Sequence, residues 1–247
     1  MSLSNSEPWR FIDDEVAARP GAANMAVDHA LLESVQAGAS PILRFYRWSA
    51  PTLSFGRNQV ARGVYDHDSD LPKVRRPTGG LAVLHHREVT YSIAIPAAVL
   101  GGPRATYLAV NRALLRGLQQ LGVPARLSAA EPRSLFGTVN PCFAEPAEGE
   151  VVARGRKLVG SAQRCERRAI LQHGSILLSN DQPAGAIGLD ELLETVPAVS
   201  EISASLRDAF GAVCGTCLAP GELSRRELER AGQLEELYAS ESWTWRR

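Results

Sequence analysis

Apolar residues near the start of the chain recur at the spacing of an amphipathic helix. The positions that share this face are Ala26, Val27, Ala30, Leu31 and Val35. Asn24 is a favourable N-cap residue and Gly38 a typical terminator, so the pattern predicts a helix between them. A longer helix is predicted from Ala105 to Leu121, where leucines fall on one stripe before Gly122.

Short runs rich in β-branched and aromatic residues predict the strands. The first two are Ile42–Trp48 and Thr52–Gly56. Lys73–Pro96 predicts a strand, a Gly-Gly turn and a second strand in which polar and apolar residues alternate. Glu150–Leu178 predicts two or three strands with a tight turn at Arg154-Gly155.

Two further helices are predicted near the C-terminus. The second opens with Ser224-x-x-Glu227, which is a capping box. Strands interleaved with helices predict an α+β (α/β) fold class, with a mixed, largely antiparallel sheet flanked by helices. Because no linker divides the chain, we expect residues 1–247 to form a single domain.

Composition narrows the classes of function. Lys+Arg and Asp+Glu both total 27, so the formal net charge is zero. The protein therefore has no net positive charge that would attract nucleic acid or an anionic membrane surface. Residues 1–9 are polar and acidic, unlike a signal peptide, and no apolar run has the length of a membrane-spanning helix. Four cysteines in this length do not suggest a disulfide framework, so we expect a cytoplasmic protein with free thiols.

The segment Arg75–His85, with sequence RRPTGGLAVLH, is the most informative one. Gly79 and Gly80 let the backbone approach a ligand, and their amides can face a carbonyl or phosphate oxygen. Arg75 and Arg76 would neutralise an anion brought to that turn. From spacing alone, the alternative is a hairpin turn flanked by surface arginines.

A second candidate pairs a cysteine with one of only two lysines in the chain. Cys142 follows a proline and turn-prone residues, so we expect it on a loop. Lys157 follows the glycine of the Arg154-Gly155 turn and could be its electrostatic partner. The alternative is that Cys142 is a buried small hydrophobic residue and Lys157 an exposed turn residue.

Other sequence signals have ordinary explanations. His173 precedes Gly-Ser, but the chain contains no Gly-x-Ser-x-Gly elbow, so we expect this histidine to orient neighbours or line a pocket. Cys214 and Cys217 have the spacing of half a zinc site but lack a second pair, so no metal site is expected. The chain contains neither a Walker A nor a Gly-x-Gly-x-x-Gly sequence, so the sequence does not indicate a nucleotide-binding site of these types.

Taken together, these motifs resemble the family of biotin/lipoate protein ligases and octanoyltransferases, from about Asn24 to the C-terminus. The segments that carry the resemblance are, in order, Asn24–Asp28, Leu43–Trp48, Thr52–Gly56, Arg75–His85 and Gly155–Gln163. The fourth is similar to the family's substrate-binding motif and the fifth to its lysine strand. The resemblance implies one biotin/lipoate protein ligase catalytic domain over residues 1–247.

Three activities compete within that family. Lipoate–protein ligases use ATP and typically have a polar Asn-Asp pair in the loop where this chain has Pro141-Cys142-Phe143. The Cys-Phe loop, with a lysine fifteen positions on, is similar to that of the cysteine/lysine octanoyltransferases. An octanoyl amidotransferase between lipoyl domains typically has a His-Gly-Gly turn, whereas this chain has Thr-Gly-Gly.

Two positions depart from the family pattern. Leu81 replaces a common third glycine and would narrow the pocket or block an adenylate, and His86 replaces an acidic or amide residue.

The resemblance therefore implies an octanoyltransferase of protein lipoylation that needs no cofactor. Cys142 would take octanoyl from acyl carrier protein as a thioester and pass it to a lysine of a lipoyl domain, such as glycine-cleavage H protein. Lys157 would be the second catalytic residue. The implied substrate-binding residues are Arg76, Thr78, Gly79, Gly80, His85, Ser161 and His173. The ATP-dependent ligase and the amidotransferase remain alternatives.

Overall fold

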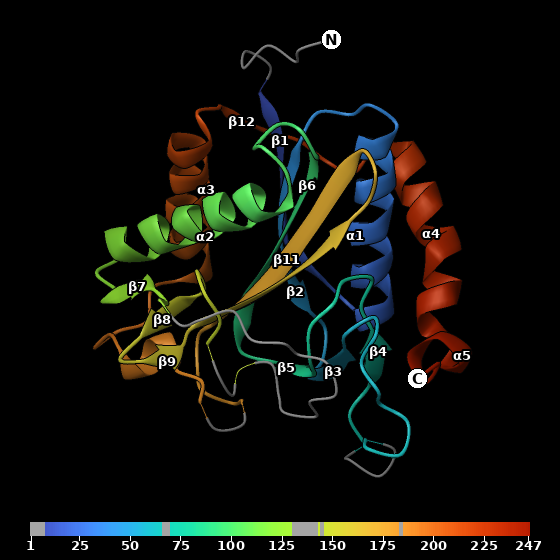
Figure 1. Ribbon diagram of the computed structural model, residues 1–247, viewed down its shortest axis with the longest axis horizontal. Coiled ribbons are helices and arrows are strands. Elements are labelled where there is room, and N and C mark those ends of the chain that lie inside the picture. Colours follow the sequence, from blue (N-terminus) through green and yellow to red (C-terminus); the bar gives the residue numbers. More distant parts are fainter. Residues whose placement is uncertain (1–7, 66–69, 130–142, 144–145, 183–184) are drawn as a thin grey trace.

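The computed structural model describes residues 8–65, 70–129, 143, 146–182 and 185–247. A six-stranded sheet lies between two pairs of helices (Figure 1). Its strands are, in spatial order, β10 (Val159–Cys165), β11 (Ala169–Leu177), β6 (Glu88–Pro96), β2 (Ile42–Trp48), β1 (Trp9–Arg19) and β12 (Leu218–Pro220). The first four strands pair antiparallel, whereas β1 runs parallel to both β2 and β12. The predicted class, α+β with a mixed and largely antiparallel sheet, is confirmed.

Each face of the sheet is covered by two helices, so its central strands are buried on both sides. Helices α1 (Gly21–Gln36) and α4 (Arg225–Ala239) pack together on one face, and α2 (Pro103–Gln120) and α3 (Val199–Cys214) on the other. In β2, Leu43 joins the α2–α3 core, while its neighbour Ile42 joins the α1–α4 core. The short helix α5 (Glu241–Thr244) follows α4. Among the described residues, no helix is both long and apolar enough to cross a membrane.

Two small sheets lie at one end of the main sheet. One contains β3 (Thr52–Phe55) between β4 (Lys73–Arg75) and β5 (Val83–His85), and the other contains β7 (Ala125–Leu127), β8 (Val151–Ala153) and β9 (Arg156–Lys157). The alternative of a hairpin at the Gly-Gly turn is wrong, because β4 and β5 pair with opposite edges of β3 and not with each other. Residues 76–82 therefore cross from one edge of this small sheet to the other.

The N-terminus of α1 also differs from the prediction. The helix begins at Gly21 with Pro20 as its N-cap, so Asn24 lies inside it. The Asn24 amide is fully buried and donates to the carbonyl oxygens of Arg19 and Arg47, at 3.2 and 3.0 Å. Asn24 thus joins α1 to the ends of two strands instead of capping the helix. The predicted capping box at Ser224 is confirmed at the start of α4.

A neutral histidine lies where α1, α4 and β10 pack together. Nε2 of His29 is 3.2 Å from Nη1 of Arg164, and because arginine only donates, Nε2 must accept. Nδ1 therefore carries the hydrogen and lies 3.0 Å from the Tyr238 hydroxyl. Burial, and then the charge of Arg164, lower the pKa of His29 to about 4. Arg230 of α4 and Arg57 act in the same direction, and Glu33 of α1 opposes them.

We expect His29 to make folding stability fall between pH 7 and pH 5. Its folded pKa lies below the unfolded value near 6.5, so the unfolded chain binds a proton that the folded protein excludes. This contribution is fully present above pH ~6.5 and is lost as the pH falls toward about 4, by about 2 kcal/mol at pH 5. Urea denaturation of wild type and His29→Gln at both pH values measures it. The free energy of unfolding of wild type relative to that of His29→Gln should fall by that amount from pH 7 to pH 5. An unchanged difference between the two proteins would contradict the lowered pKa of His29.

Candidate active site

A pocket opens over the face of the sheet that α1 covers, beyond the first turns of that helix. The strand register pairs Tyr46 with Thr90, Thr90 with Ser175, and Ser175 with Gly160. These four residues therefore form one row across β2, β6, β11 and β10, in which Tyr46, Thr90 and Ser175 direct their side chains to one face and Gly160 leaves that face open. The space above them is about 360 Å³ when the part open to solvent is included. The remaining lining residues are Met25, Trp48, Arg76, Val83, His85, Phe143, Ser161, Ala162, His173 and Gly174.

Strand β6 contributes buried polar side chains to the pocket end of the sheet, where apolar core residues would otherwise be expected. The predicted alternation of polar and apolar residues is present, and Tyr91 and Ile93 point into the α2–α3 core. Thr90 and Ser92 on the opposite face are as buried as the apolar residues, at 2% and 1% exposure. A buried polar row needs hydrogen-bond partners, which the pocket residues supply.

Arg76 supports the glycine turn from beneath. The residue is 4% exposed, and its guanidinium donates from Nη2 to the carbonyl oxygens of Gly79 and Leu81, at 3.1 and 2.9 Å. Nη1 donates to the Ser54 hydroxyl at 2.6 Å. Gly80 has φ +89°, which other residues rarely adopt, and an added Cβ would lie 3.2 Å from Arg76 Nη2. The Gly79 amide points to the carbonyl oxygen of Gln163 at 3.4 Å, and so toward β10.

The expectation that Arg75 would neutralise an anion at the turn is wrong. Arg75 is also fully buried, but its guanidinium donates to carbonyl oxygens away from the pocket. Nη1 donates to Gly56 and Gln59, both at 2.7 Å, and Nε donates to Thr244 at 2.9 Å. Arg75 therefore joins the loop after β3 to the C-terminus, and Arg76 is the arginine that lines the pocket.

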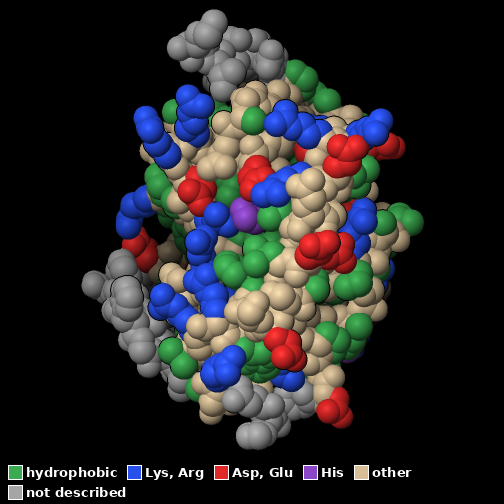
Figure 2. Space-filling model, turned by 90° about the vertical axis from the view of Figure 1, so that its right-hand side faces the viewer, with side chains coloured by type: hydrophobic (Ala, Val, Ile, Leu, Met, Phe, Trp, Pro, Cys, Tyr) green, Lys and Arg blue, Asp and Glu red, His purple; other side chains and the backbone are tan. Residues whose placement is uncertain are grey.

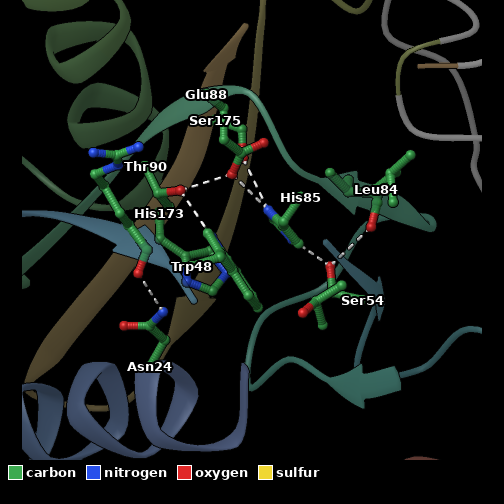
Figure 3. Close-up of polar contacts among 12 residues, drawn as sticks. Asn24, Trp48, Ser54, Leu84, His85, Glu88, Thr90, His173 and Ser175 are labelled. Carbon is green, nitrogen blue, oxygen red and sulfur yellow. Dashed lines mark hydrogen bonds and ion pairs between the residues drawn. The ribbon is translucent and has the colours of Figure 1, made fainter. Parts of the chain in front are cut away.

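His85 lies in a chain of hydroxyl, imidazole and carboxylate groups (Figure 3). Nε2 is 2.6 Å from Ser54 Oγ, Nδ1 is 2.7 Å from Glu88 Oε1, and the ring stacks on Trp48 at 3.8 Å. The hydroxyls of Thr90 and Ser175 also donate to Glu88 Oε1. Glu88 Oε2 is buried without a hydrogen-bond partner among the described residues. The ring of His85 is thus fixed in the pocket wall from three sides.

His173 lies in a second chain of the same composition. Its Nε2 is 2.6 Å from Thr78 Oγ1 and its Nδ1 is 2.9 Å from Asp28 Oδ2. Burial lowers the pKa of His173. Burial alone would raise the pKa of Asp28, but the His173 hydrogen bond and the Arg44 charge hold it below its usual value. Neutral His173 therefore donates from Nδ1 to ionised Asp28 and accepts at Nε2 from Thr78. This chain ties α1 and β11 to the glycine turn.

Ser161 lies on β10, next to Gly160 of the pocket row, and its hydroxyl points to the side of the sheet that α2 covers. Its Oγ is 2.8 Å from the Tyr91 hydroxyl and donates to Asn111 Oδ1 at 3.2 Å. The hydroxyl is therefore held by groups from β6 and α2, and the residue lines the pocket. All the substrate-binding residues predicted from the sequence thus line the pocket or contact a residue that does.

Lys157 is buried, so its interpretation as an exposed turn residue is wrong. Arg154 and Gly155 both have positive φ and form a two-residue turn that places Lys157 opposite Val152. The side chain is 3% exposed, and Nζ lies 2.7 Å from Glu150 Oε1. Nζ also lies 5.4 Å from the ring centre of Phe143, a pocket-lining residue.

Cys142 itself lies outside the described residues, but its neighbour does not. Phe143 is fully buried, and its ring packs against the position where Gly160 has no side chain. An added Cβ at Gly160 would lie 2.8 Å from that ring. The buried ammonium of Lys157 therefore lies close to the residue that follows Cys142.

The two departures from the family pattern lie outside the pocket lining. Leu81 is buried and contributes its carbonyl oxygen to Arg76. His86 is exposed and its Nδ1 lies 2.9 Å from Asp181 Oδ2. No group of three or more His, Cys, Asp or Glu that could hold a metal ion occurs within the described ranges.

Several residues of this network were not selected from the sequence. They are Asp28, Trp48, Ser54, Glu88, Thr90 and Ser175. The signal for Ser175 was available, because it lies two residues after His173 and two-residue spacing keeps strand residues on one face. No local signal connects Asp28 with His173, which are 145 residues apart.

The model of the lipoyl protein ligase A/B catalytic domain matches residues 20–206. Octanoyltransferase LipM of Kyrpidia tusciae is 35% identical, with 98% of this chain and 100% of the relative covered. The LipM proteins of Symbiobacterium thermophilum and Bacillus subtilis are 38% and 34% identical, covering 97% and 98% of this chain and 98% and 99% of their own lengths.

Solved structures give the same fold at lower sequence identity. A T. acidophilum protein with bound lipoic acid has a TM-score of 0.80 at 22% identity, covering 98% of this chain and 100% of its own. Lipoate-protein ligase A bound with ATP has a TM-score of 0.79 at 21% identity, covering 97% and 98%. An archaeal two-part lipoate protein ligase, studied with its E2 lipoyl domain, has a TM-score of 0.74 at 20% identity and covers 97% and 96%.

Proposed function

Because this chain belongs to the lipoyl protein ligase A/B catalytic-domain family, we propose that its pocket receives an octanoyl group during protein lipoylation. The chain is an octanoyltransferase, as are the named relatives that it matches over nearly its full length. Enzymes of this kind act on lipoyl-domain proteins. We propose acyl carrier protein as the donor of the octanoyl group, and a lipoyl-domain lysine, such as that of glycine-cleavage H protein, as its acceptor.

We propose that the transfer occurs in two steps through Cys142. The thiolate attacks the carbonyl carbon of the octanoyl thioester, the bond to the carrier's sulfur breaks, and the carrier leaves as a thiolate. The acceptor amine then attacks the enzyme thioester, the amide forms, and Cys142 leaves as a thiolate while the amine gives up a proton. The observation that carries this proposal is the buried Lys157 ammonium beside Phe143, the residue after Cys142.

The Glu150–Lys157 pair makes Lys157 a cation and not a base. A buried ammonium 2.7 Å from a carboxylate is stabilised in its charged form. Such a group can stabilise the negative charge on the sulfur or on the developing oxyanion. A fixed charge acts more strongly in a buried site than in water. Lys157 therefore supplies electrostatic stabilisation in both steps.

We propose that the pocket separates the two ends of the acyl group. The side chains of Met25, Trp48, Val83 and Phe143 provide apolar surface for the eight-carbon tail. Each buried methylene contributes about 0.8 kcal/mol, which is enough to discriminate chain length several-fold per carbon. Arg76 and the Thr78-Gly79-Gly80 turn would position the carbonyl end, with His85 and His173 orienting the walls.

We also propose that residues 1–247 work as one catalytic domain. The family model ends at residue 206, but the segments beyond it pack on the same body. Strand β12 pairs with β1, and α4 packs along α1. The buried guanidinium of Arg75 fixes the last residues to the loop after β3.

The transferase and the ATP-dependent ligase predict opposite outcomes in two assays. A carrier thioester is already activated, so octanoyl should pass from octanoyl carrier protein to an apo lipoyl domain without ATP. Free lipoate is not activated, so with ATP and magnesium we expect negligible transfer. Mass spectrometry of the lipoyl domain measures both reactions. Transfer only from free lipoate with ATP, unaffected by Cys142→Ala, would overturn the proposed mechanism and leave the fold assignment standing.

A further inference from the structure

A cluster of arginines lies where the loop after β3 meets the C-terminus. Its members, here called the arginine cluster, are Arg57, Arg62, Arg246 and Arg247. Arg57 is half-buried and the other three are exposed. Figure 2 shows Lys and Arg side chains gathered down the middle of the face that carries α4 and α5, with Asp and Glu more scattered.

The backbone beneath the arginine cluster is held firmly in place. The amides of Ala61 and Arg62 both donate to the Arg247 carbonyl oxygen at 2.9 Å. Beneath them, the Arg75 guanidinium donates to six carbonyl oxygens, three in this loop and three in the C-terminal segment 243–247. The Arg246 guanidinium also lies 4.4 Å from the ring centre of Trp243. The four charges are therefore carried by an ordered surface.

Among the described residues, the positive charge of the arginine cluster is not compensated by ion pairs. In the part of the chain that the structure describes, none of the four arginines forms an ion pair with an Asp or Glu side chain. After burial, the charges of Arg57 and Arg247 lower the pKa of Arg246. A protein of zero net charge thus keeps mutually repelling cations together on one surface.

The arginine cluster adjoins the glycine turn at the pocket. Gly56 packs so closely on the turn that an added Cβ would lie 1.8 Å from the Gly80 carbonyl oxygen. The amide of Arg57 donates to the Thr78 carbonyl oxygen at 2.7 Å. Two large apolar side chains of the same loop, Val60 and Val64, are 57% and 44% exposed. Positive charge and exposed apolar surface therefore lie together beside the pocket.

We propose that the arginine cluster, with Val60 and Val64, is the docking surface for the carrier protein of the acyl donor. The carrier would present a carboxylate-rich surface with an apolar contact, and its thioester arm would reach past the glycine turn into the pocket. This inference rests on the proposed function, which requires a protein-borne thioester. Exposed charges of this kind act mainly on the association rate, and salt screens them.

Charge reversal tests the surface without touching the pocket. We expect Arg57→Glu/Arg246→Glu to lower the second-order rate of enzyme acylation by octanoyl carrier protein on the order of tenfold at low salt. The difference in acylation rate between the double variant and wild type should become smaller in high salt, because salt screens exposed charges. Acylation by octanoyl-pantetheine, which lacks the carrier protein, should be unchanged. Intact-mass measurement of the acyl-enzyme over time gives both rates, and Arg116→Glu on exposed α2 surface is the matched control.

The outcomes separate this inference from the function on which it rests. A double variant that reacts with octanoyl carrier protein as fast as wild type would overturn the docking surface. Equal slowing with both donors would also overturn it, because the change would then act on the pocket. If wild type forms no acyl-enzyme with either donor, the proposed function fails and the docking surface fails with it.

Discussion

Replacing Cys142 with alanine should abolish transfer from octanoyl carrier protein and remove the acyl-enzyme altogether. The thiolate is the only group in the proposed mechanism that forms a bond to the acyl carbon, so no other interaction can substitute for it. Loss of a nucleophile of this type lowers the rate by about 10⁴-fold or more. Intact-mass analysis of wild type with octanoyl carrier protein should show one added octanoyl group that hydroxylamine removes, and the variant should show none.

A second thiol provides the control for this experiment. Cys165 at the end of β10 is a free and exposed cysteine, as is Cys217, so adventitious acylation could occur at either. Cys165→Ala should therefore keep both the adduct and the activity. An adduct that survives in Cys142→Ala, or that maps to Cys165, would show that the nucleophile is misassigned.

Local sequence pattern predicted the elements that local residues determine. Strand Ile42–Trp48 has the predicted bounds, because β-branched and aromatic residues alone indicate it. Strand β1 was not predicted, because Asp13, Asp14 and Glu15 interrupt its apolar pattern. Asp14 is tolerated there because buried Arg44 of β2 donates to it at 2.6 Å. That pairing joins residues 30 apart, and no short window of sequence contains both.

The pocket could be predicted in its members but not in their connections. The sequence indicated His85 and His173, and both line the pocket. Their carboxylate partners, Glu88 and Asp28, depend on how β5 and β6 meet and on how α1 lies against β11. These contacts arise from packing, which motif spacing does not specify. For the same reason the sequence could not distinguish Arg75, which joins two segments, from Arg76, which lines the pocket.

The burial of Lys157 changes how its catalytic role must be tested. A drop of about two units in a thiol pKa would raise the thiolate fraction roughly 25-fold, but lower nucleophilicity would cost about tenfold of that gain. Activation of the thiol alone is therefore worth only a few-fold. Removing Lys157 also leaves Glu150 as a buried and unpaired carboxylate, and breaking such a pair costs about 3–5 kcal/mol. Lost activity in Lys157→Ala could then reflect poor folding.

We therefore expect the clearest result from replacing both members of the pair. Lys157→Met should lose activity by about 10²–10³-fold, as when an oxyanion donor is removed, and should also lower the midpoint of urea unfolding. Lys157→Met/Glu150→Gln removes both charges and should recover the unfolding midpoint without recovering activity. Lys157→Arg should recover only part of the activity, because a planar guanidinium does not replace a compact ammonium. Full activity in the double variant would mean that Lys157 only neutralises Glu150, and the electrostatic role beside Cys142 would have to be abandoned.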